Sequence, residues 1–402
     1  MPRSTRRPIL YASVFGFLAL FILFSNALQL PYSPNIARGG TEPTSERFAT
    51  LPPTPRNNGG SAKWTIRSNK FVSNYPKGFS MIIDVTSSGG KISLARIKWR
   101  HSTSKLYESQ GYPDQSGHIL AGWVPNFQDY KPGWVGVEYW WVLIDARGNT
   151  YETEHAYAEY ADNTRKWNRL EAEDAIIHWE ASLPAQIGPA IADALKSQHD
   201  RYFQAWGKLL NYKPHIIIYA SFKPWQEWDP KVDVNWIEGE TDPDWGATVQ
   251  IYRTKEKDAL KRLTAGVVLH ELEHLYQQTY NPFGTYHKMV WFYEGDATYL
   301  ELYQFYSYLA EVKAMAKVNQ LPRLEQEPAL RLGDRLGYDI GYAFWVFLEK
   351  TYGPDAHRLV WEQTGKGLPI QQALQKVTKK PFADLEDEFR VWVGARPLQA
   401  KN

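Results

Sequence analysis

The feature that most constrains this chain is the sequence HELEH at positions 270–274. Apolar residues such as Val268 and Leu275 recur around it at helical spacing, which predicts an α-helix with one face in the core. His270 and His274 are four residues apart, so their side chains project from the same side of that helix, one turn apart. Two imidazoles in this arrangement can bind one metal ion.

Glu271 follows the first histidine directly and gives the segment a candidate general base. A carboxylate beside a bound metal can accept a proton from water, as a hydrolase requires. The five-residue pattern alone also arises by chance on amphipathic helices, so a third ligand is needed to favour a site. Glu273, the other acid of the segment, is expected at a solvated helix position, with a contact to a ligand histidine as the alternative.

A second segment, 291–301, supplies the candidate third ligand. Catalytic zinc takes three protein ligands and keeps one position open. Glu294 lies 20 residues after His274, near the start of a second predicted helix. Gly295 and Ala297 are small enough to let two helices approach closely there.

Together the two segments resemble the gluzincin superfamily, the peptidase MA-like metallopeptidases that include the zinc aminopeptidases. That pattern is HExxH, followed about 20 residues later by an aromatic-x-x-E-G-x-[AT]-x-Y helix, and residues 291–299 match its second part. The resemblance implies that His270, His274 and Glu294 bind Zn²⁺ and that Glu271 is the general base.

The segment 338–349 extends the resemblance to the Y-x-x-G-[FY]-A helix of the aminopeptidases. The first tyrosine of that helix donates a hydrogen bond to the oxyanion, and it corresponds to Tyr338 here. A phenol suits this role because it stays protonated at neutral pH. Tyr342 is the alternative donor.

The chain departs from the aminopeptidases in lacking their G-x-M-E-N strand, whose glutamate binds the amino terminus of the substrate. The corresponding stretch, 244–252, offers Val249 and Gln250 instead. We expect an edge strand there that pairs with extended peptide backbone. Glu240, from the acidic segment 238–242, is the alternative source of a negative charge.

These observations predict a zinc metallopeptidase that acts on a peptide or protein substrate, as an endopeptidase. An aminopeptidase is one alternative. A zincin-fold surface scaffold without catalysis is the other, although binding alone has no need for the Glu271 base.

Composition narrows the classes further. The chain has no cysteine, which excludes disulfides and thiolate ligands, so a metal site must use histidine and carboxylate. The net charge is only +2, without a basic cluster interleaved with aromatics, so no nucleic-acid partner is expected.

The N-terminus predicts a membrane segment. Arg3, Arg6 and Arg7 precede the apolar run 9–24. This favours an uncleaved single-pass anchor in the cell membrane with the body extracytoplasmic. The alternative is a secreted protein, released by cleavage near 25–27.

The expected fold class is multidomain. Short alternating runs separated by glycine-rich turns predict an all-β, Ig-like sandwich, and an α+β zincin-like domain with a helical C-terminal part follows. The expected parts are a membrane segment at 1–30, a Pro/Gly-rich linker at 31–60, the sandwich at 61–165 and the metallopeptidase domain at 166–402.

The sandwich and the remaining histidines carry little functional signal. Trp134, Trp140 and Trp141 are expected in the core, with a sugar-stacking platform as the weaker alternative. His287 lies between the two predicted metal helices, and we expect a solvated or packing role. The other histidines have no partner at ligand spacing and are expected to be structural: His101, His118, His155, His178, His199, His215 and His357.

Overall fold

The computed structural model describes residues 61–101, 105–126, 129–230, 237–281, 289–324 and 335–398. The predicted membrane segment, the linker and His287 lie outside these ranges. Among the described residues no helix is both long and apolar enough to cross a membrane. This finding corrects the predicted single-pass membrane protein, which the structure does not support.

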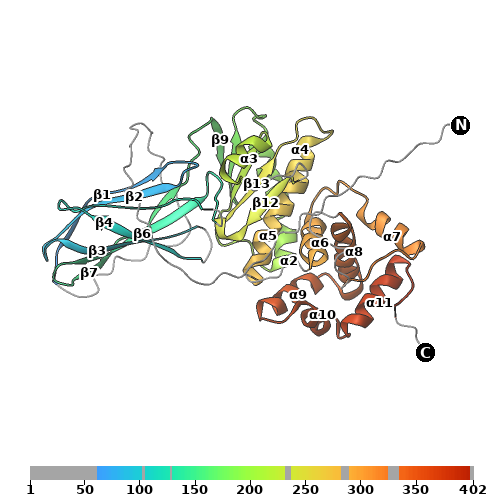
Figure 1. The fold of residues 1–402 in the computed structure, drawn as a ribbon. Helices are drawn as coiled ribbons and strands as arrows, with labels where there is room; N and C mark the ends of the chain where they lie inside the picture. The colour runs from blue at the N-terminus through green and yellow to red at the C-terminus, as the bar shows by residue number, and fades with distance from the viewer. Residues whose placement is uncertain are drawn as a thin grey trace. The chain divides into compact units, whose positions relative to one another are not determined.

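The first part of the described chain is one curled antiparallel sheet (Figure 1). Its strand order is β1-β2-β5-β4-β3-β6-β7, and β8 also pairs with β6. The strands are β1 (Trp64–Ser73), β2 (Phe79–Ser87), β3 (Ile92–Arg100), β4 (Tyr107–Pro113), β5 (His118–Trp123), β6 (Gly136–Asp145), β7 (Thr150–Glu152) and β8 (Ala156–Glu159).

The predicted Ig-like sandwich is therefore wrong, and β4 is the reason. Its first residues pair with β3, whereas Tyr112 and Pro113 pair with β5, so one strand joins what would be two separate sheets. Gly111 lies at the change of partner. A Cβ atom there would lie 2.8 Å from Ile119 and from Trp141, so only glycine lets the sheet curl this tightly over its core.

The tryptophans of this sheet do not form an exposed platform. Trp141 is fully buried, and Trp140 is buried with its ring stacked on His155 at a centroid distance of 4.0 Å. Trp134 stacks on His178 instead. The structure thus favours packing over sugar binding for these residues.

A second, mixed sheet follows, with strand order β12-β13-β11-β10-β9. Its strands are β9 (Trp167–Glu171), β10 (Ile176–Glu180), β11 (His215–Tyr219), β12 (Gly239–Asp242) and β13 (Ala247–Ile251). The central strands β10, β11 and β13 are parallel, and the two outer strands are antiparallel to their neighbours. The edge strand expected within 244–252 is therefore wrong, because β13 is an interior strand and β12 forms the edge.

Both faces of this sheet are covered, which explains why β11 and β13 are buried along their whole length. Ile216 and Ile218 pack with the helices, whereas Ile217 and Val249 join the core of the first sheet. The division of the chain near residue 165 stays a prediction.

Helices make up most of the remaining chain, and most of them lie on one side of the second sheet (Figure 1). The helical elements are α1 (Ile187–Ser197), α2 (His199–Trp206), α3 (Phe222–Trp228), the 3₁₀ turn η1 (Pro243–Trp245), α4 (Ala259–Arg262), the π-helical turn η2 (Leu263–Val267), α5 (Val268–Tyr280), α6 (Val290–Leu300), α7 (Tyr308–Lys317), α8 (Arg335–Tyr352), α9 (Ala356–Gly365), α10 (Ile370–Thr378) and α11 (Phe382–Val393). The exceptions are α3 and η1, whose tryptophans pack with the core of the first sheet.

Candidate metal centre

The predicted metal helix is α5, and the third predicted ligand lies on α6. His270 Nε2 lies 3.0 Å from Glu294 Oε2, and His274 Nε2 lies 3.5 Å from the same oxygen. All three ligand atoms lie within 4.8 Å of one another. The structure thus brings these side chains together in one largely buried cluster, and their binding of zinc stays a prediction.

Two further side chains orient the histidines. His270 Nδ1 lies 3.0 Å from Glu301 Oε1, and His274 Nδ1 lies 3.0 Å from Gln277 Oε1. With a metal bound, each Nδ1–H would donate to its oxygen, and the Nε2 lone pair would be left free for the ion. Two imidazole nitrogens and one carboxylate are a donor set that fits zinc.

Charge and burial act in opposite directions at this cluster. Burial raises the pKa of the Glu294 carboxyl, but the facing charges of His274 and His270 outweigh it, so the pKa falls well below its usual value. Glu271 behaves differently. Burial raises its pKa, and the two histidines only partly offset that rise. A carboxylate with a raised pKa is the stronger proton acceptor, as a general base needs.

The edge strand β12 passes directly beside Glu271. Thr241 Oγ1 lies 2.8 Å from Glu271 Oε2 and can donate a hydrogen bond to it. A Cβ atom on Gly239 would lie 2.5 Å from both Cγ and Oε1 of Glu271. The strand can therefore approach the carboxylate this closely only because residue 239 has no side chain.

Gly239→Ala is expected to displace the Glu271 side chain and lower kcat by about tenfold or more, because misplacing a catalytic group by about 1 Å can cost 10²-fold. Stability should change little, since the clash is with a movable side chain. Hydrolysis rate and thermal unfolding would be measured together. Gly266→Ala is the matched control, because its new Cβ meets no atom closer than 3.5 Å. An unchanged kcat in Gly239→Ala would contradict the assigned close approach.

Of the two candidate oxyanion donors, Tyr338 is the one beside the ligands. Its ring lies nearly parallel to that of His270, with centroids 5.9 Å apart, and its hydroxyl is hydrogen-bonded to Glu294. Burial, followed by the charges of Glu294 and Glu271, raises the pKa of Tyr338 well above its usual value, so the phenol keeps its proton. Tyr342 packs instead against Tyr308, at a centroid distance of 5.2 Å.

The helices that carry Glu294 and Tyr338 cross at two glycines. A Cβ atom on Gly295 would lie 2.2 Å from Gly341 Cα, so α6 and α8 touch backbone to backbone (Figure 1). This contact sets how closely the two functional side chains approach.

Glu273 is not the solvated position that the sequence favoured. It is fully buried and lies in a cluster with Asp296 and His357. Burial, and then the charge of Asp296, raises the pKa of Glu273 well above its ordinary value. Gln277 Nε2 donates to Asp296 Oδ2 at 3.1 Å, so Gln277 links the ligand His274 to this buried cluster.

Four residues of the site were not predicted from the sequence. Gln277 stands three residues after His274 on the same helix, and that spacing could have indicated it. Glu301 stands seven residues after Glu294, directly after the last residue of α6. Gly239 and Thr241 lie about 30 residues before Glu271, on β12, and no nearby sequence pattern indicates that they contact it.

Comparisons with known proteins give only distant likenesses. No protein-family model matches the sequence, and neither does any curated protein. Among solved structures, native leukotriene A4 hydrolase from Saccharomyces cerevisiae has a TM-score of 0.36 at 11% identity, covering 82% of this chain and 67% of that one. The yeast LTA4 hydrolase complex with bestatin has a TM-score of 0.35 at 10% identity, covering 83% and 67%.

A polysaccharide deacetylase from Bacillus cereus is also similar, with a TM-score of 0.18 at 10% identity, covering 54% of this chain and 78% of that one. Likenesses at this level assign no activity to the chain. The functional argument therefore depends on the geometry of the cluster itself.

Proposed function

We propose that this chain is a zinc-dependent hydrolase that cleaves internal peptide bonds. The observation that carries the proposal is the convergence of His270, His274 and Glu294, with Glu271 and Tyr338 beside them. A scaffold would need the ligands at most, whereas this cluster also contains a base with a raised pKa and a protonated phenol.

Each residue then has a definite task. His270, His274 and Glu294 would hold the zinc, which when bound polarises the scissile carbonyl and acidifies water. Glu271 takes the proton from the attacking water and delivers it to the leaving amine. The Tyr338 hydroxyl donates a hydrogen bond to the oxygen on which negative charge develops.

Substrate binding is proposed at β12. This strand ends the sheet, and no described strand pairs with its outer side. Its free backbone groups can therefore pair with an extended peptide. The strand lies against Glu271 through Gly239 and Thr241, so a peptide paired to it runs past the candidate base.

The side chains of β12 support cleavage inside a chain. Because alternate residues face opposite sides of a strand, Glu240 points away from the side that carries Gly239 and Thr241. Burial, followed by the charges of Asp229 and Glu271, raises the pKa of the Glu240 carboxyl to about 8, so this group is largely uncharged at neutral pH. Glu240 is thus poorly placed to bind a substrate amino terminus beside the metal.

The test of this proposal compares one peptide with a free and with an acetylated amino terminus. We expect similar cleavage of both, at internal bonds, with products identified by mass spectrometry. Strict dependence on the free amine, with residues released singly from that end, would favour the aminopeptidase. No cleavage in a broad peptide library by the zinc-loaded chain would favour the scaffold.

Tyr338→Phe is expected to lower kcat by about tenfold or more and to leave KM nearly unchanged. A hydrogen bond used only for the oxyanion contributes in the transition state and not in the ground state. Tyr342→Phe is the matched control and should keep kcat. The reverse pattern would move the oxyanion role to Tyr342.

A further inference from the structure

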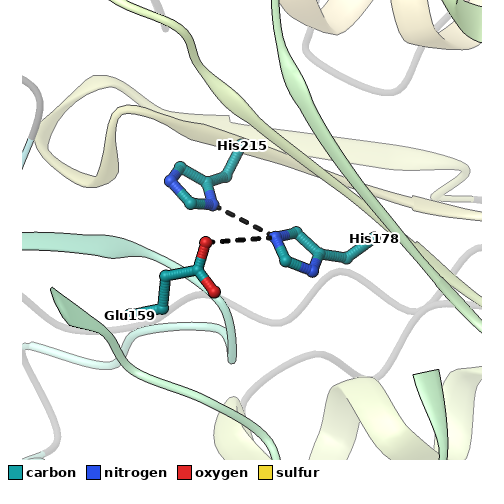
Figure 2. Close-up of side chains that lie close together, drawn as sticks. All are labelled: Glu159, His178 and His215. Carbon is teal, nitrogen blue, oxygen red and sulfur yellow. Dashed lines mark hydrogen bonds and ion pairs between the residues drawn. The ribbon is translucent and has the colours of Figure 1, made fainter. Parts of the chain in front are cut away.

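A second histidine-carboxylate cluster lies where the first sheet meets the second (Figure 2). Glu159 ends β8, His178 lies in the middle of β10, and His215 begins β11. His215 Nδ1 lies 3.4 Å from His178 Nε2, and His178 Nε2 lies 3.8 Å from Glu159 Oε1. Three donor atoms from three strands therefore face one another.

Both histidines of this cluster are fully buried. Trp134 stacks on the His178 ring at a centroid distance of 4.6 Å and helps to hold its orientation. The remaining ring nitrogens, His178 Nδ1 and His215 Nε2, have no hydrogen-bond partner in the structure.

The separations are close to those of a zinc site. Two nitrogens bound to one tetrahedral zinc, each at about 2.0–2.1 Å, are about 3.4 Å apart, which is the separation found between the two histidines. The Glu159 oxygen lies 3.8 Å from His178 Nε2 and within 4.8 Å of the His215 ligand atom, so it would have to move closer to both to bind the same ion.

Arg169 is the competing partner of the carboxylate. Its guanidinium lies 3.3 Å from Glu159 Oε1 and 3.6 Å from Glu171. The Arg169 side chain is 41% exposed, so it can remain paired with Glu171 while Glu159 turns toward the histidines. A carboxylate also has a second oxygen, which can keep the arginine contact.

We propose that Glu159, His178 and His215 form a second zinc site, distinct from the candidate catalytic cluster. The ion would join β8 of the first sheet to β10 and β11 of the second, with water as its fourth ligand. Its role would be structural, because the ion would join strands of two sheets, and it does not depend on the proposed hydrolase activity. The three residues follow no ligand spacing along the chain, so no site was predicted there from the sequence.

The test is metal stoichiometry on the whole 402-residue chain, stripped with a chelator and dialysed against Zn²⁺. We expect two zinc ions per chain by mass spectrometry of the metal. His178→Ala and His274→Ala should each keep one, and the double variant should keep none. His199→Ala is the matched control and should keep two, because His199 pairs with Asp174 outside both clusters.

Glu159→Gln tests the site with a variant that is expected to fold normally, because this side chain is only partly buried and the amide has the shape of the carboxylate. The circular dichroism spectrum of the variant should match that of the parent. Its zinc affinity at one of the two sites should fall by more than about tenfold, because even mutation of a residue that only hydrogen-bonds to a metal ligand costs about that much. A parent chain that binds only one zinc, which His274→Ala loses and a folded His178→Ala keeps, would overturn the second site. Two zinc ions kept in a folded His178→Ala would overturn it as well. One zinc lost in His178→Ala but kept in His274→Ala would support it while refuting the proposed catalytic site.

Discussion

Glu271→Gln is expected to keep the zinc at His270, His274 and Glu294 while lowering kcat by about 10²–10⁴-fold, the usual contribution of general acid-base catalysis. The amide has the shape of the carboxylate and can still accept a hydrogen bond from Thr241, so the local structure should persist. It cannot accept the proton of the attacking water. Zinc content and peptide hydrolysis would be measured on the same preparation.

The matched control for this variant is Glu311→Gln, the same chemical change at an exposed position of α7. It should leave both zinc content and kcat unchanged. A Glu271→Gln variant that hydrolyses peptide as fast as the parent would show that another group is the base. Loss of zinc together with activity would instead show that Glu271 supports the metal cluster.

The parts of the site that the sequence predicted are those encoded within single helices. His270 and His274 share α5, so helical geometry alone sets their relative placement. Glu294 lies on α6, and Glu301 follows the end of that helix directly. The pairing of α5 with α6 came from the resemblance in spacing. The same short-range logic could have identified Gln277.

What could not be predicted depends on contacts between distant segments. Thr241 reaches Glu271 only because β12 pairs antiparallel with β13 and thereby forms the sheet edge above α5. The sequence of β12, GETD, has no apolar alternation from which a strand could be recognised. The closeness of His270, His274 and Glu294 was thus predictable, whereas the strand beside Glu271 was not.

The wrong sandwich prediction has a related cause. Alternating apolar residues indicate strands, but they do not specify which strands pair. The split pairing of β4 depends on Gly111, and a single glycine in a strand indicates only a bend or a close approach. His178 and His215 were likewise expected to be structural, because neither has another histidine or carboxylate at ligand spacing in the sequence. They come together only because β10 and β11 are neighbouring strands of the second sheet.

Gly341→Ala is expected to reduce the free energy of unfolding by about 3 kcal/mol, at the upper end of the usual cost of overpacking. The new Cβ would lie 1.9 Å from the Trp291 carbonyl oxygen and 2.6 Å from Gly295 Cα. Both are backbone atoms, so no rotamer change can relieve the clash and α6 must move away from α8. Guanidinium unfolding followed by tryptophan fluorescence measures the loss.

Movement of α6 away from α8 should also lower kcat, because α6 carries Glu294 and α8 carries Tyr338. This effect can be measured separately from the loss of stability. At temperatures where the Gly341→Ala variant remains folded, kcat should still fall, since widening the helix crossing separates the phenol from the ligand to which it is hydrogen-bonded. The control is Gly266→Ala, because Gly266 is a buried glycine of η2 with room for a methyl group. This variant should lose much less stability and much less kcat than Gly341→Ala. A Gly341→Ala variant with parental stability and kcat would mean that the two helices do not meet backbone to backbone, and the placement of Tyr338 beside Glu294 would lose its structural basis.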